Sequence, residues 1–327
     1  MKTIVITSIN HPTSQVKKWA KLSGYNLIVV GDNKSPVEYN VTNTKFLNIN
    51  EQRSLYPEFA KVLPENHYCR KLMGYLYAAN ELKSQIIIDT DDDNSPLENW
   101  TDGLSLMYSE VKSLNDSWIN IYKHFSEENI WPRGYPVQLD KSFNGRITEN
   151  SAKGVDISQG LVQGDPDVDA IFRLNNHIKS FSFNDSSPLF LSPNHSFSPT
   201  NSQNTTFIKK FFPLLYLPSS VTFRYTDILR GYVLLSLKKK WNIKIGFRSA
   251  DVYQDRNEHD LIIDLNSELP FFNDAFSIID KMINNLESRS NNQIVDDIFF
   301  TYEFLEKEKV VHKTELKTLE EWLKAIN

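Results

Sequence analysis

The sequence predicts an α/β fold with a mainly parallel sheet, because short apolar runs alternate with helical patterns near its start. The apolar runs occupy residues 4–6, 27–30 and 86–88, and helical patterns lie at residues 15–22 and 69–82. An order of strand, helix and strand implies right-handed crossovers between parallel neighbours. In open sheets of this kind, ligands bind beyond the carboxyl ends of the strands.

Local signals support each of these elements. In the helix at residues 69–82, the apolar residues Leu72, Leu76 and Ala79 are spaced by four and three, which places them on one face. The loop after the second strand, residues 31–36, is rich in turn-forming residues. We therefore expect a Rossmann-like sheet flanked by helices.

The C-terminal part of the chain is expected to be helical from residue 271 onward. A stripe at helical spacing there predicts core packing, and it consists of Leu316, Leu319, Leu323 and Ile326. The chain is thus predicted to form an α/β domain over residues 1–265 and a helical C-terminal extension over residues 266–327.

The composition excludes several classes of protein. The 327 residues are 40% hydrophobic and 24% charged, with a net charge of -5, which argues against a nucleic-acid-binding surface. No apolar run approaches the roughly 20 residues that cross a bilayer. The single cysteine, Cys69, fits a reducing compartment. We expect a cytoplasmic protein without a transmembrane segment, in peripheral contact with the inner face of the membrane if its substrate is lipid-linked.

Polar residues follow the predicted strands. Thr7 and Ser8 follow the first strand and Asp32 follows the second, while the third runs into an acidic cluster that consists of Asp89, Asp91, Asp92 and Asp93. Carboxylate oxygens are hard ligands that suit Mg²⁺ or Mn²⁺ held together with substrate phosphates. The alternative is a solvated acidic turn.

Two cations, Arg70 and Lys71, open the helix before that strand. Positive charge at a helix N-terminus opposes the macrodipole, so an anion such as phosphate would explain these residues. Alternatively, they pair with the nearby aspartates.

Long motifs, taken in order, are similar to those of the STELLO-like glycosyltransferase family. They are "IVITSIN", "VVGDNKSP", "HYCRKLMGYLYA", "IIIDTDDDN", "WPRGYP", "GLVQGDPDVDAIFRL", "FRYTDILRGYV" and "YQDRNEHDL". The resemblance covers about residues 3–265. The stretch around the third and fourth motifs is also similar to the reversibly glycosylated polypeptides, which are sugar-nucleotide mutases.

The resemblance implies a GT-A fold in which the acidic cluster coordinates a divalent cation beside a nucleotide sugar. Asp91 and Asp93 would face the metal. Asp89 and Asp92 are the alternative metal ligands, because the register of the turn cannot be read from sequence. Three residues would line the base and ribose pocket: Thr7, Ser8 and Asp32. Arg70 and Lys71 would face the diphosphate.

The later motifs supply the other candidates. Gly160 and Asp165 would border the donor sugar, although an acidic turn before a strand explains the same pattern. The resemblance implies that Asp227 is the base that deprotonates the acceptor, the alternative being an ordinary first-turn helix residue. His259 would complete the metal shell and Arg256 would neutralise phosphate, provided that their loop folds back over the sheet edge.

We therefore expect a metal-dependent, inverting glycosyltransferase that takes a nucleotide-sugar donor and a glycan or lipid-linked acceptor. Bacterial surface polysaccharide synthesis is the expected setting. The alternatives are a sugar-nucleotide mutase and a non-catalytic scaffold that binds nucleotide sugars.

Overall fold

The computed structural model describes residues 1–114, 117–176, 180–194, 196–256, 260–290 and 293–326. Its strands are β1 (Lys2–Thr7), β2 (Asn26–Val30), β3 (Thr44–Leu47), β4 (Ile86–Thr90), β5 (Asn94–Pro96), β6 (Met107–Ser113), β7 (Gly145–Lys153), β8 (Ile157–Gly164), β9 (Leu189–Leu191), β10 (Asn204–Ile208) and β11 (Ile245–Gln254). Its helices are α1 (Ser14–Trp19), α2 (Ile49–Leu55), α3 (Pro57–Val62), α4 (Lys71–Asn80), α5 (Ala170–Asn175), α6 (Thr226–Leu237), α7 (Leu261–Asp274), α8 (Ile278–Glu287), α9 (Ile294–Lys307) and α10 (Thr314–Ile326). Short 3-10 helices lie at Tyr68–Arg70, Ile121–His124 and Lys209–Leu215.

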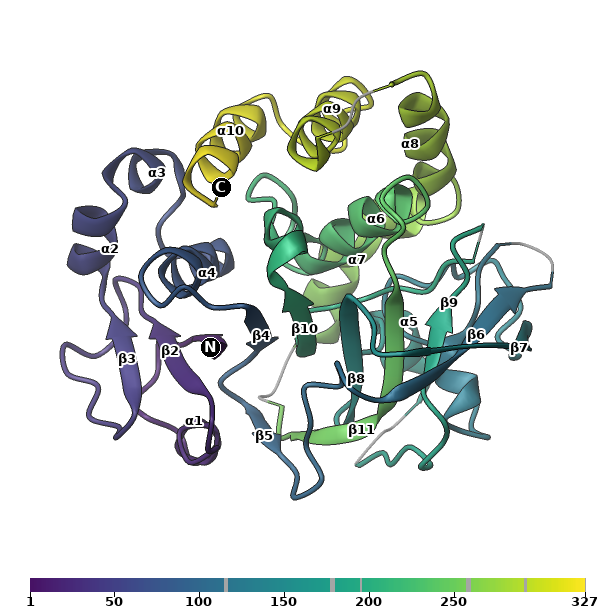
Figure 1. The fold of residues 1–327 in the computed structure, drawn as a ribbon, viewed down its shortest axis with the longest axis horizontal. Helices are drawn as coiled ribbons and strands as arrows, with labels where there is room; N and C mark the ends of the chain where they lie inside the picture. The colour runs from purple at the N-terminus through teal and green to yellow at the C-terminus, as the bar shows by residue number, and fades with distance from the viewer. Residues whose placement is uncertain (115–116, 177–179, 195, 257–259, 291–292, 327) are drawn as a thin grey trace.

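The strands of the described residues form one 11-stranded sheet, drawn in Figure 1. Its order is β3-β2-β1-β4-β10-β8-β11-β9-β6-β7, with β5 paired to β11. The first four strands in this order, β3, β2, β1 and β4, are mutually parallel, as predicted. Beyond them the sheet is mixed, because β10 runs antiparallel to both β4 and β8. The α/β class with flanking helices is confirmed.

Strand β1 shows why the two faces of the sheet are covered by helices. Its side chains alternate, so Ile4 packs in one apolar cluster and Val5 packs in another. The cluster around Ile4 includes Trp19 of α1, and the cluster around Val5 includes Leu72 of α4. The sheet is therefore enclosed between α1 on one face and α4 on the other.

The antiparallel strand β10 shapes the site. Its first residue, Asn204, pairs with Thr90, the last residue of β4. The residues just before β10 therefore lie beside the acidic turn that follows β4. The sequence patterns did not predict this neighbour.

The C-terminal residues are helical, as expected, and α8, α9 and α10 share a core with the α/β part of the chain. In the view of Figure 1, α8, α9 and α10 lie above α4 and α6. In α10, the Trp322 indole donates to the carbonyl of Pro213 at 3.0 Å, and Asn80 of α4 donates to the carbonyl of Ala325 at 2.8 Å. Of the predicted stripe, Leu319, Leu323 and Ile326 are buried in the same core as α4. The expected boundary at residue 265 falls inside α7.

None of the helices in the described ranges combines the length and the apolar character that crossing a bilayer requires.

Candidate active site

One large cavity, of about 430 Å³, lies where β1, β2, β4 and β11 end. Its volume is in the range of small-molecule sites. Charged side chains dominate its lining, and they are Asp32, Lys34, Arg70, Asp91, Asp92, Asp93, Arg133, Asp167, Arg224, Asp227 and Arg256. Thr7, Ser8, His67, Tyr68, Ser202, Gln203, Phe223 and Gln254 are among the other lining residues. The predicted strand-end location of the site therefore holds a cavity.

At the β1 and β2 end, backbone groups fix the carboxylate of Asp32. The amide of His67 donates to Oδ2 at 3.0 Å, and the amide of Asn33 donates to Oδ1 at 2.8 Å. The Ser8 hydroxyl donates to Oδ2 of Asp92 at 2.6 Å. Thr7, Ser8, Asp32 and Asp92 all line the cavity, and the assignment of Thr7, Ser8 and Asp32 to a nucleoside pocket stays a prediction.

Two cations form ion pairs with Asp89, the first residue of the acidic cluster. Asp89 is fully buried, with Lys71 Nζ 2.7 Å from Oδ1 and Arg230 Nη1 2.7 Å from Oδ2. Lys71 is also fully buried and lies 2.8 Å from Asp91 Oδ1. Lys71 does not line the cavity, so the structure shows the alternative interpretation of this residue, pairing with nearby aspartates.

Arg70 lines the cavity but is only 1% exposed. Its Nε donates to Gln52 Oε1 at 2.9 Å, and Nη1 donates to the carbonyl of Leu63 at 3.3 Å. These contacts tie the start of α4 to α2 and α3, which is a structural role. Binding of a diphosphate by Arg70 stays a prediction.

Asp91 and Asp93 fit a divalent cation that takes further ligands from substrate and water. Gln254 donates to Asp93 Oδ2 at 3.0 Å, while Oδ1 is buried and has no hydrogen-bond partner in the described part of the chain. Burial, reinforced by the Asp91 carboxylate, raises the pKa of Asp93 to about 7. A buried carboxylate oxygen without a partner is costly unless a cation or donor arrives.

No ready-made cage of three or more His, Cys, Asp and Glu ligands occurs among the described residues. Mg²⁺ is often held by only one or two carboxylates together with substrate phosphates, so two aspartates are a sufficient protein contribution. His259, the predicted third ligand, lies outside the described residues.

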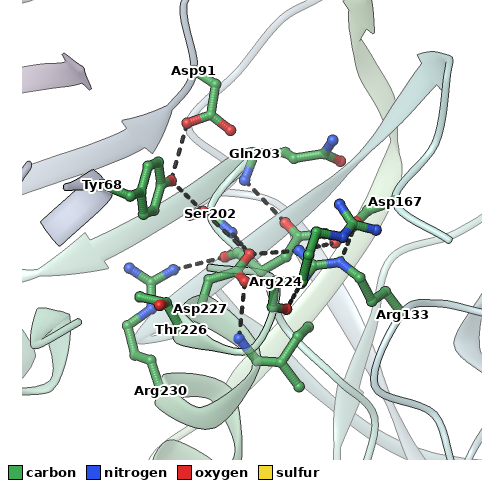
Figure 2. Close-up of polar contacts among 12 residues, drawn as sticks. Tyr68, Asp91, Arg133, Asp167, Ser202, Gln203, Arg224, Thr226, Asp227 and Arg230 are labelled. Carbon is green, nitrogen blue, oxygen red and sulfur yellow. Dashed lines mark hydrogen bonds and ion pairs between the residues drawn. The ribbon is translucent and has the colours of Figure 1, made fainter. Parts of the chain in front are cut away.

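The opposite side of the cavity is built around Asp227 in the first turn of α6 (Figure 2). Arg133 lies 2.8 Å from Asp227 and 2.7 Å from Asp167, so one guanidinium bridges two buried carboxylates. Ser202 donates its backbone N–H to Asp227 Oδ2 at 3.3 Å. The N-cap residue of α6 is Tyr225, so Asp227 is not the helix cap.

The remaining predicted donor-sugar residues lie outside the main cavity. Gly160 lines a smaller cavity beside it, together with Arg133 and Gln203. A Cβ at Gly160 would lie 2.2 Å from Asn204 Nδ2, so packing between strands requires this glycine. Asp165 is ion-paired with Arg173 at 2.5 Å.

Arg256 does reach the main cavity, from the end of β11. Its Nη2 lies 3.1 Å from Asp264 Oδ2. Burial, with Arg173 and Arg224 nearby, lowers the pKa of Arg256 to about 10, so the guanidinium stays charged at neutral pH.

The sequence analysis assigned no role to Tyr68, Ser202 and Arg230. They contact Asp91, Asp227 and Asp89, respectively. Tyr68 and Arg230 lie inside motifs that were noticed, but neither has a spacing that indicates its partner. Ser202 reaches the site only because β10 pairs with β4.

Two curated proteins of Arabidopsis thaliana are similar to this chain. "Probable glycosyltransferase STELLO2" is 29% identical over 251 residues, and "Probable glycosyltransferase STELLO1" is 30% identical over 251 residues. Each match covers 71% of this chain and 32% of the relative, so the chain spans about a third of the length of these relatives. No family model matches the sequence.

Among solved structures, the crystal structure of GalNAc-T7 with UDP, GalNAc and Mn²⁺ aligns with 95% of this chain and 57% of its own. The identity is 9% and the TM-score is 0.32. A likeness this distant assigns neither a fold nor a ligand to the present chain.

Proposed function

Because its Arabidopsis relatives confirm that this chain belongs to a STELLO-like glycosyltransferase family, we propose that it transfers a sugar from a nucleotide-sugar donor. The acceptor would be a glycan or a lipid-linked glycan, and catalysis would depend on Mn²⁺ or Mg²⁺. The cavity at the strand ends carries this proposal, because Asp93 lines it and the buried Oδ1 of Asp93 has no hydrogen-bond partner among the described residues.

The donor would bind along the side formed by β1, β2 and β4. Asp32, oriented by two backbone amides, would accept hydrogen bonds from the ribose or base, and Thr7 and Ser8 would line the same pocket. Arg256, which is charged and lines the cavity, would contact the diphosphate. These placements follow the GT-A arrangement that the family resemblance implies.

Asp91 and Asp93 would hold the divalent cation. When bound, such a cation offsets the negative charge that grows on a diphosphate leaving group. Asp93 contributes an oxygen that no protein group satisfies, and Asp91 is held in place by Lys71 and Tyr68.

Asp227 would serve the acceptor, in an inverting displacement. The acceptor oxygen would attack the anomeric carbon as the bond to the diphosphate breaks, and its proton would pass to the Asp227 carboxylate. A general base must lie within hydrogen-bond reach of the hydroxyl that it deprotonates. The position of Asp227 in the lining of the cavity that Asp91 and Asp93 also line supports this assignment.

A panel of nucleotide sugars tests the proposal. With Mn²⁺ and a mixture of glycan and lipid-linked acceptors, at least one donor should release its nucleoside diphosphate, and EDTA should stop the release. Asp93→Asn should abolish it, whereas Asp140→Asn, at an exposed position outside the cavity, should not. Sugar-ring isomerisation without nucleotide release would indicate a mutase. Binding without turnover of any donor would indicate a scaffold.

A further inference from the structure

Asp91 and Asp227 have separate roles in the proposed function, and the following inference rests on that function. Asp91 follows β4 and Asp227 lies in α6, yet both line the same cavity. One carboxylate faces the cation side and the other faces the acceptor side. Figure 2 shows two hydroxyl groups between them, those of Tyr68 and Ser202.

Hydrogen-bond contacts run without a break from Asp91 through Tyr68 and Ser202 to Asp227. The Tyr68 hydroxyl donates to Asp91 Oδ1 at 3.0 Å and lies 2.6 Å from the Ser202 hydroxyl. The Ser202 hydroxyl lies 3.3 Å from Asp227 Oδ2, and the Ser202 backbone N–H lies 3.3 Å from the same oxygen. Each link is within hydrogen-bond range, although the two at Asp227 are long.

The hydroxyl protons of Tyr68 and Ser202 are too few for all of these hydrogen bonds to form at once. Ionised Asp91 can only accept, so the contact with Asp91 takes the single hydroxyl proton of Tyr68. Ser202 must then donate if it is to bond Tyr68. Since Ser202 also has only one hydroxyl proton, it serves either Tyr68 or Asp227 at a given moment. Its backbone N–H contacts Asp227 in both cases.

Packing alone does not require the Tyr68 hydroxyl. The Tyr68 ring contacts Phe223 edge to face, with ring centroids 5.4 Å apart, and Lys71 Nζ lies 5.0 Å from the ring centroid. A phenylalanine at this position would keep the ring contacts. It would remove the hydroxyl contacts with Asp91 and Ser202, and also the contact with Lys71, whose Nζ donates to the Tyr68 hydroxyl oxygen at 3.0 Å.

We propose that Tyr68 and Ser202 are positioning residues that couple the cation side of the site to the acceptor side. Cation binding changes the hydrogen bonds of Asp91. The Ser202 hydroxyl then changes its hydrogen-bond partner, which alters the hydrogen bonding of Asp227. Thermodynamic linkage makes the effect reciprocal, so a change at Asp227 alters cation affinity through the same two residues.

Calorimetric titration of the full chain with Mn²⁺ alone tests this coupling. The proteins are wild type, Asp227→Asn, Tyr68→Phe and the double variant. Asp227→Asn removes a charge and so changes the Mn²⁺ Kd through space in either background. The factor by which Asp227→Asn changes the Mn²⁺ Kd should differ between the wild-type and Tyr68→Phe backgrounds. The expected difference is about threefold or more, a typical size for residues in one hydrogen-bond network. Ser202→Ala should remove the same coupling, and it serves if Tyr68→Phe does not fold.

The chain offers matched controls. Tyr75, on the neighbouring helix α4, and Ser198 both have buried hydroxyls that find no hydrogen-bond partner among the residues that the structure describes. In Tyr75→Phe and Ser198→Ala backgrounds, Asp227→Asn should have its wild-type effect on the Mn²⁺ Kd.

An effect of Asp227→Asn that is equal in the wild-type, Tyr68→Phe and Ser202→Ala backgrounds would overturn the coupling alone. Absence of Mn²⁺ binding to the wild-type protein would instead overturn the cation site of the proposed function, and the inference with it.

Discussion

Arg133 holds both carboxylate oxygens of Asp227, because Nη1 donates to Oδ1 at 3.0 Å and Nη2 donates to Oδ2 at 2.8 Å. The same guanidinium donates to Asp167 through Nε at 2.7 Å and through Nη2 at 3.0 Å. All three side chains are nearly excluded from solvent. One cation therefore bonds two buried carboxylates and fixes the orientation of Asp227 before a substrate arrives.

Removing Arg133 should destabilise the fold. Arg133→Ala leaves two buried carboxylates unpaired, so the free energy of unfolding should fall by about 3–5 kcal/mol in urea denaturation. Arg146→Ala, at an exposed position on β7, is the control and should stay within about 0.5 kcal/mol of wild type. A loss below about 1 kcal/mol for Arg133→Ala, the scale of an exposed ion pair, would contradict this account.

Asp227→Asn should lower turnover by about 100- to 10,000-fold, the usual contribution of a general base. At saturating Mn²⁺, donor affinity should stay near the wild-type value, because Asp227 is assigned to the acceptor. Slow hydrolysis of the donor with transfer abolished is the expected pattern in a product analysis. Full transfer activity would rule out the base role, and Asp167 would be the next carboxylate to test.

Asp93→Asn should separate stability from metal binding. Without metal, the free energy of unfolding should rise, since the variant removes a buried carboxylate whose Oδ1 has no hydrogen-bond partner among the described residues. Added Mn²⁺ should raise the Tm of the wild type but not that of the variant, because only a protein that binds the ligand gains stability from it. Equal Mn²⁺ effects on both proteins would contradict the role of Asp93.

Lys238 should give the fold a measurable pH dependence. Burial lowers the pKa of Lys238 to about 7, and its Nζ donates to the carbonyl of Ser192 at 2.6 Å. The folded pKa lies below the unfolded value, so the unfolded chain binds more protons between these two pKa values. The contribution of Lys238 to stability should therefore increase as the pH rises from 7 to 9.

Lys238→Met should remove this increase. The difference in free energy of unfolding between wild type and variant should change in favour of wild type over that pH interval, as measured by urea denaturation. Parallel stability curves for the two proteins from pH 7 to 9 would show that Lys238 keeps its ordinary pKa in the fold.

Local patterns predicted the first sheet strands well. The run at residues 86–88 became β4, and the pattern at residues 69–82 became α4 with the short 3-10 turn before it. These elements have strong periodic signals, and the parallel order of β1, β2 and β4 follows from their connections. The strand-end location of the cavity could be predicted for the same reason.

The pairing of charges could not be predicted. Lys71 was expected to face a phosphate, yet it is fully buried against Asp89 and Asp91. Arg230, which completes the neutralisation of Asp89, comes from α6 far along the chain. Such pairs depend on how β10 and α6 pack on β4, and the sequence carries no local signal for that packing.

The proposed activity requires that Asp91 and Asp93 hold a divalent cation beside a nucleotide in the cavity. Anomalous diffraction from crystals soaked with Mn²⁺ and a nucleoside diphosphate measures this directly. We predict a manganese peak bonded to carboxylate oxygens of Asp91 and Asp93, with the diphosphate completing its coordination. A diphosphate bound in the cavity with no manganese peak at these two residues would contradict the claim.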